Sequence, residues 1–121
     1  MAIVREKKIT IGSRNFIIKF PNVGQLIDLE SLKLALTNNR YGNMAASGIA
    51  SMYDALDMVD AIAFYTVVVP EVAKYYNIEN FSTAQIDTVS ELIKVYSQEI
   101  KPWFNETMNE LKNVSKDSNV G

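Results

Sequence analysis

A change in the spacing of the apolar residues constrains the fold of this chain more than any other feature. Over residues 7–20, "KKITIGSRNFIIKF", apolar and polar residues alternate on both sides of the turn-forming stretch "GSRN". This alternation predicts an antiparallel hairpin with one apolar face and one face in water. The apolar face would carry Ile9, Ile11, Phe16, Ile18 and Phe20.

After Pro21 the spacing becomes helical. The segment "VGQLIDLESLKLAL" predicts a helix over 23–37, with Asn22 as the N-cap and Gln25 completing a capping box. Its stripe of apolar residues, which Ile27 and Leu34 widen, would face the core. Two strands alone are marginal in water, so the hairpin needs such helices to cover its apolar face.

The most apolar stretch, 61–70, allows three interpretations. A membrane span is disfavoured, because it needs about 20 apolar residues. A short buried strand "FYTVVV" is an alternative, since consecutive valines favour β structure. Helical spacing from Met52 to Thr66 instead favours the last turns of an amphipathic helix that begins near Ser51. Pro70 then suits the first position of a new short helix.

A further helix is predicted from the stretch "FSTAQI". Ser82 would be its N-cap, Gln85 its third residue, and Phe81 would pack on Ile86 as a hydrophobic staple. Pro102 is expected to kink or restart this helix.

These patterns predict one α+β domain over 1–112, in which an N-terminal antiparallel β-hairpin, 7–20, packs on a bundle of about four α-helices within 22–112. Residues 113–121 are expected to form a flexible polar tail.

The inventory of reactive groups is poor. The 121 residues include neither Cys nor His, which removes thiolate nucleophiles, zinc–sulfur sites and the commonest general base at neutral pH. Asp54, Asp57 and Asp60 recur every three residues, but on a helix they spread over about 120° and do not converge as metal ligands. We therefore predict no catalytic, cofactor-binding or metal-binding residue and no small-molecule substrate.

Charge is distributed unevenly. Residues 1–20 carry a net charge of +4, and the remainder of the chain carries −6. The basic residues are Arg5, Lys7, Lys8, Arg14 and Lys19. Three interpretations stay open: lysines that protect a hairpin edge against stray pairing, a surface for nucleic-acid phosphates, or a basic hairpin that meets the acidic helix of another copy head to tail.

Three aromatic residues are candidate interface anchors. Phe64 and Tyr65 lie in the apolar stretch, next to 67–69, and Trp103 follows Pro102. Adjacent residues on a helix point about 100° apart, so one residue of an aromatic pair can be in the core while the other is exposed. Core packing is the default interpretation of such aromatics, whereas an exposed aromatic side chain is a good anchor for a partner protein.

In layout, the hairpin "KKITIGSRNFIIKF", the helix "NVGQLIDLESLKLAL", the acidic-to-apolar helix and the Trp-containing C-terminal helix resemble small assembly proteins of tailed bacteriophages. The chain is similar to tail assembly chaperones and to small auxiliary proteins that decorate or join virion parts. The resemblance covers residues 7–112.

The resemblance implies a non-enzymatic protein that binds other phage proteins or itself, including as a ring-like or head-to-tail oligomer. The N-terminus is charged within five residues and does not resemble a signal peptide. The expected location is the host cytoplasm during assembly or the virion. The alternative is a small nucleic-acid-binding or regulatory protein that uses the basic hairpin.

Overall fold

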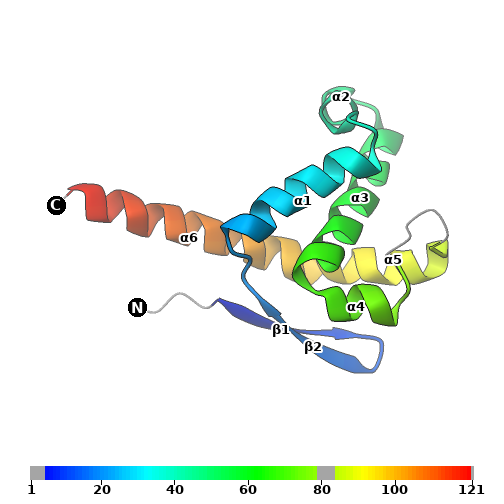
Figure 1. Cartoon of the computed structure of the whole chain (residues 1–121), viewed down its shortest axis with the longest axis horizontal. Helices are drawn as coiled ribbons and strands as arrows, with labels where there is room; N and C mark the ends of the chain where they lie inside the picture. The colour runs from blue at the N-terminus through cyan, green and yellow to red at the C-terminus, as the bar shows by residue number, and fades with distance from the viewer. Residues whose placement is uncertain (1–4, 79–83, 121) are drawn as a thin grey trace.

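The computed structural model describes residues 5–78 and 84–120, and side chains as far as Asn113 of the last helix. Figure 1 shows a two-stranded hairpin lying against a group of helices, with one long helix projecting beyond the rest. The elements are β1 (Glu6–Ile11), β2 (Arg14–Lys19), α1 (Val23–Leu36), α2 (Tyr41–Ala46), α3 (Ala50–Val68), α4 (Pro70–Tyr75), α5 (Ile86–Val95), the π-helical segment η2 (Tyr96–Ile100) and α6 (Lys101–Val120). The predicted α+β class is confirmed.

The hairpin has the predicted two faces. β1 and β2 pair antiparallel, with Ile9 opposite Phe16 and Lys7 opposite Ile18. Ile9, Ile11, Phe16 and Ile18 on this face are buried, whereas Phe20 is half-buried. Gly12 opens the two-residue turn with φ of 61°, a conformation that glycine adopts without steric cost.

Helix α1 begins as predicted. The Asn22 side chain accepts a hydrogen bond from the backbone N–H of Gln25, and the Gln25 side chain accepts one from the backbone N–H of Asn22. This capping box fixes the chain direction immediately after β2, and α1 then packs against α3.

Helix α3 is the central element of the core. It contacts α1, α2, α4, α5 and η2, and residues 61–65 are buried along its C-terminal half. The apolar stretch is therefore helical, as the favoured interpretation predicts, and Val69 lies in a non-helical conformation before Pro70 starts α4. Among the described residues, no helix has both the length and the apolar character needed to span a membrane.

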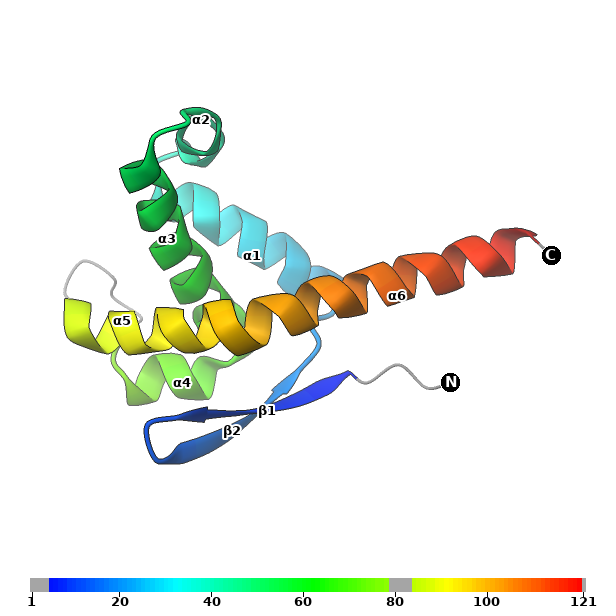
Figure 2. The ribbon, with the colours of Figure 1, turned by 180° about the vertical axis from the view of Figure 1, so that it is seen from behind.

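The C-terminal half of the structure is one continuous helical rod made of α5, η2 and α6, seen from behind in Figure 2. Pro102 does not break it. The π-helical segment lies immediately before the proline, and Lys101 donates its backbone N–H to the Tyr96 carbonyl, five residues back. This wider turn accommodates a residue that has no N–H of its own.

Three local predictions differ from the structure. Gln85 is extended and is itself the N-cap of α5, so it is not the third residue of that helix, and the proposed cap at 81–83 falls outside the described residues. The short helix α2 is formed by "YGNMAA", for which the sequence pattern predicted no separate helix. The segment expected as a polar tail, 113–121, is helical as far as Val120.

Candidate interaction surfaces

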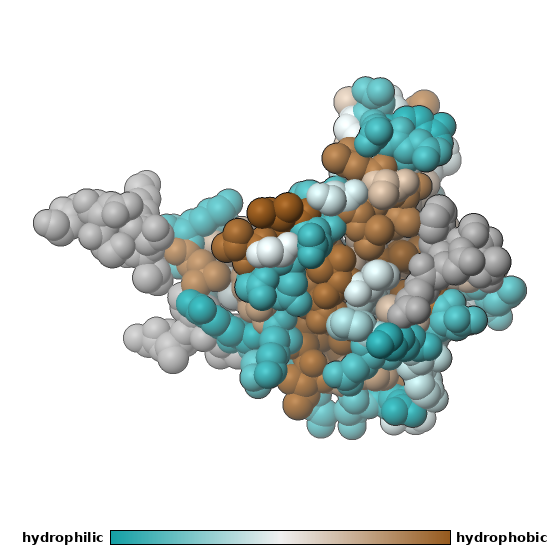
Figure 3. Space-filling model, viewed as in Figure 1, coloured by the Kyte–Doolittle hydropathy of each residue, from teal (hydrophilic) through white to brown (hydrophobic). Residues whose placement is uncertain are grey.

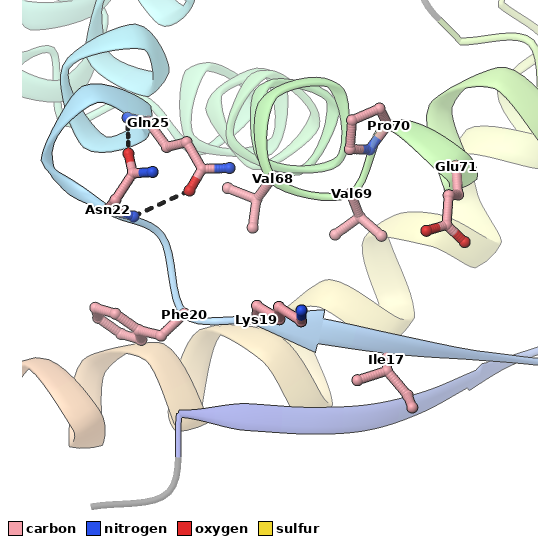
Figure 4. Close-up of a pocket in the computed structure, with 9 residues that line it drawn as sticks. All are labelled: Ile17, Lys19, Phe20, Asn22, Gln25, Val68, Val69, Pro70 and Glu71. Atoms are coloured by element: carbon pink, nitrogen blue, oxygen red, sulfur yellow. Dashed lines mark hydrogen bonds between the residues drawn. The ribbon is translucent and has the colours of Figure 1, made fainter.

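The groove in Figure 4 lies between strand β2 and the corner where α3 meets α4. It has a volume of about 410 Å³. β2 contributes Ile17 and Lys19, and the opposite wall consists of Val68, Val69 and Pro70, with Glu71 at its end. The capping residues at the start of α1 close a third side.

The side of β2 that faces this groove is an unpaired strand edge. The backbone N–H of Phe20 donates to the Arg5 carbonyl at 2.7 Å, which makes Phe20 and Arg5 a hydrogen-bonded pair. In an antiparallel ladder these pairs recur every second residue. The N–H and C=O groups of Asn15, Ile17 and Lys19 therefore point away from β1, and within 5–78 and 84–120 no backbone partner is found for them.

Helix α1 carries a second apolar face that the rest of the described chain does not cover. Val23 is 72% exposed, Ile27 61% and Leu34 44%. At 100° per residue these three positions lie within about 40° of one another, on the side away from the buried Leu29. We call these three residues the α1 stripe. Apolar side chains gather over α1 in Figure 3, and the predicted placement of Ile27 and Leu34 toward the core is wrong.

A second exposed apolar region lies where α2 meets the start of α3. A groove of about 490 Å³ there is lined by Met44, Ile49 and Met52, together with the polar Arg40 and Asn43. Ile49 is 52% exposed. This groove is broad and has apolar walls with polar ends, which is typical of a surface for another protein rather than of a catalytic cleft.

The three predicted acidic residues on α3 divide into two groups. Asp54 and Asp57 are exposed. Asp60 accepts a hydrogen bond of 2.6 Å from the Tyr41 hydroxyl and lies 3.7 Å from the Lys33 ammonium. Burial, followed by this hydrogen bond, raises the pKa of Tyr41. Asp60 therefore holds α2 and α1 to α3, and only Asp54 and Asp57 remain on the surface.

The five basic residues of the hairpin do not share one face. Lys8 and Lys19 lie on the exposed face, and Arg5 is also exposed. Lys7 is half-buried, on the face that carries Ile18. The Arg14 guanidinium lies 4.0 Å from the centre of the Tyr75 ring. A phosphate backbone would thus meet only part of the charge that the sequence places in this segment.

Phe64 and Tyr65, which we expected at an interface, are instead core residues. Phe64 is 2% exposed and Tyr65 is fully buried. Their rings pack against Tyr96 of the long rod, and Phe64 also contacts Phe104. The chain covers these two aromatics with its own helices, so they are corrected from interface anchors to core. Val69 is buried as well.

Trp103 is half-buried and packs edge-to-face on Phe20, with ring centres 5.7 Å apart. Phe20 also stacks on Phe104 at 5.2 Å. Within the described part of the chain, the buried Trp103 Nε1 has no hydrogen-bond partner. This indole serves chiefly to join the end of the hairpin to α6, and only its outer part reaches the surface.

The charged residues in another cavity form ion pairs with one another. A cavity of about 300 Å³ between α1, α3 and α6 contains Glu30, Lys33 and Asp60. Lys33 lies 3.0 Å from Glu30 and 3.7 Å from Asp60. Across 5–78 and 84–120, no cluster of three or more acidic side chains could hold a metal ion.

Comparison with known proteins yields no matching protein family, no similar curated protein and no similar solved structure.

Sequence reasoning missed the groove beside β2 and the α1 stripe. The groove beside β2 depends on the meeting of residues about fifty positions apart, which no local pattern reports. The α1 stripe could have been found, because α1 has apolar residues on nearly all sides and a helix with only one buried side must expose some of them.

Proposed function

We propose that this chain is a non-enzymatic subunit that binds other proteins, and that it acts in the assembly or the virion of a tailed bacteriophage. The observation that carries the first part is the α1 stripe. Three large aliphatic side chains in line on one exposed helix face form a contiguous apolar surface, unlike the scattered exposed residues of an ordinary monomer. The phage assignment rests on the resemblance in layout.

Helix packing explains why such a stripe binds protein. Its members are spaced by four and seven residues, the spacing that presents a seam to a second helix. Glu30 falls in the middle of this seam and is largely exposed. It would favour a partner that offers a basic or hydrogen-bonding residue at that level. The partner is therefore another assembly protein or another copy, joined through a helix-on-helix contact.

The test is a pair of matched substitutions on α1. Ile27→Glu places a charge in the α1 stripe, whereas Ala35→Glu places the same charge on an exposed position about 80° away from it on the same helix. Size-exclusion chromatography with light scattering would follow the protein alone and mixed with purified capsid and tail proteins of a tailed phage. We expect Ile27→Glu to weaken association at least tenfold and Ala35→Glu to leave it within about twofold.

Circular dichroism must show that both variants keep the helical fold. A wild-type protein that stays strictly monomeric and binds none of these proteins would overturn the proposal.

A further inference from the structure

We propose that the groove beside β2 binds an extended segment of a partner protein as a third strand of the sheet, and that this segment alternates acidic and apolar residues. The inference deepens the proposed protein-binding function and rests on it. The inference is based on three features: the unpaired backbone groups of β2, the opposite wall of the groove, and the positive charge of the hairpin.

The edge supplies backbone recognition. Ile17 and Lys19 line the groove and direct their N–H and C=O groups away from β1, as the pairing of Phe20 with Arg5 requires. An added strand would satisfy these groups without disturbing the hairpin. Main-chain hydrogen bonds of this kind give affinity for any extended peptide, and the side chains around them give selectivity.

The opposite wall makes the edge a groove rather than a bare strand. Val68, Val69 and Pro70 face β2 across the gap in Figure 4. The volume of about 410 Å³ admits a short extended segment but not a second hairpin. Successive side chains of a strand point to opposite sides. One set would therefore meet Ile17 and Lys19, and the other would meet the valines.

The two edges of the hairpin differ in a way that favours this assignment. On β1 the outward-facing residues are Glu6, Lys8 and Thr10, so charge protects this edge against stray pairing. The β2 edge has an isoleucine, Ile17, at its centre, and this side chain is 64% exposed. Ile17 would become buried only when a bound segment covers it.

Charge selects the occupant. Residues 5–20 carry a net charge of +4, so pairing of two copies through their β2 edges would bring two basic hairpins together. Acidic partner residues on the side of the added strand that meets Ile17 and Lys19 are attracted by Lys19 instead. The apolar partner residues alternate with them and meet Val68 and Val69, on the wall that also carries Glu71. We therefore assign the groove to a strand of a different protein rather than to a second copy.

The experiment uses the full chain and three eight-residue, end-capped peptides. The first alternates glutamate and valine, the second alternates lysine and valine, and the third is the glutamate–valine peptide with N-methyl groups on alternate amides. Amide hydrogen exchange measured by NMR reports binding at single residues. We expect the first peptide to slow exchange at Ile17 and Lys19 at least tenfold and to leave Lys8 and Thr10 unchanged. The other two peptides should bind at least tenfold more weakly.

Two variants locate the contact. Ile17→Pro removes an N–H from the open β2 edge, and Thr10→Pro removes one from the open β1 edge without changing the charge. We expect Ile17→Pro to abolish peptide binding and Thr10→Pro to preserve it. Should Ile17→Pro fail to fold, Lys19→Glu keeps the backbone and is expected to weaken binding of the glutamate–valine peptide at least fivefold, because it replaces the attracting charge with a repelling one.

Equal binding of all three peptides, unchanged exchange at the β2 edge, or a self-association that Ile17→Pro removes would each overturn the inference. Association that depends on Ile27 but not on Ile17, with no peptide bound, leaves the proposed function standing and rejects the groove as its site. If the protein neither associates nor binds a peptide, both the proposed function and the groove are rejected.

Discussion

The hydroxyl of Tyr65 on α3 donates a hydrogen bond of 2.8 Å to the backbone carbonyl of Leu92 on α5. Both residues are buried, and the contact joins the central helix to the long rod just before its π-helical segment. It satisfies the one polar atom of a large aromatic side chain in the core. Tyr65 therefore acts in folding rather than in binding a partner.

This burial makes the stability sensitive to high pH. Desolvation raises the pKa of Tyr65 above its ordinary value of 10.0, and burial also raises the pKa of Tyr96 and Tyr41. The folded state favours the neutral phenol, so this contribution is fully present below pH 10 and is lost as pH rises through the folded-state pKa values. We expect the free energy of unfolding in urea to be nearly constant up to about pH 9 and to fall progressively as the pH rises above about 10.

Tyr65→Phe tests the origin of this fall. It should cost about 1 kcal/mol near pH 8 through the lost hydrogen bond, and it should make the alkaline fall shallower than in the wild type. An equally steep fall in the variant would place the effect in the other buried tyrosines.

Adjacent residues of β2 should respond very differently to the same truncation. Ile18→Ala opens a cavity at a fully buried position and is expected to cost roughly 2–5 kcal/mol of unfolding free energy. Ile17→Ala, one residue earlier and 64% exposed, should stay within about 0.5 kcal/mol of the wild type. Chemical denaturation measures both. Similar costs for the two would show that the hairpin register differs from the one described.

The start of α1 depends on the reciprocal hydrogen bonds of Asn22 and Gln25, of 2.9 and 3.0 Å. Asn22→Ala should reduce the unfolding free energy by about 1 kcal/mol, because it leaves the Gln25 N–H without its acceptor. Asn22→Ser keeps an acceptor at this position and serves as the control, with a loss of less than about 0.5 kcal/mol. Thermal unfolding followed by circular dichroism would separate the two, and equal losses would contradict a capping role.

The contact between Tyr41 and Asp60 attaches α2 to α3 and can be measured by a double-mutant cycle. Tyr41→Phe and Asp60→Ala, alone and together, should give a coupling free energy of about 1–2 kcal/mol, since the acceptor is a half-buried carboxylate. Urea denaturation provides the four values. A coupling indistinguishable from zero would mean that α2 is held by its other contacts.

Local patterns predicted several elements because each depends on neighbours in the chain. The alternation over 7–20 fixed which hairpin residues are buried, and Asn22 with Gln25 fixed where α1 begins. The same reasoning failed at Gln85, where a favourable capping sequence does not start the helix. It also missed α2, whose turn-forming residues become helical where Tyr41 is bonded to α3.

The candidate sites were less predictable. Phe64 and Trp103 could each have been core or interface by sequence, because helical spacing does not say which other element lies opposite. Among the charged candidates, only the structure separates Asp60, which is bonded within the chain, from Asp54 and Asp57 on the surface.

The sequence by itself determined the hairpin, the main helices and the poverty of reactive side chains, because propensity, period and residue type act over a few neighbouring positions. Only the tertiary structure decided which apolar faces found a partner inside the chain. It covered Phe64 and Tyr65 with the long rod, left Ile27 on an open helix face, and brought Val68 opposite the free edge of β2. Burial is a property of the packed arrangement, so which surfaces stay exposed for other proteins depends on contacts between segments far apart in the chain.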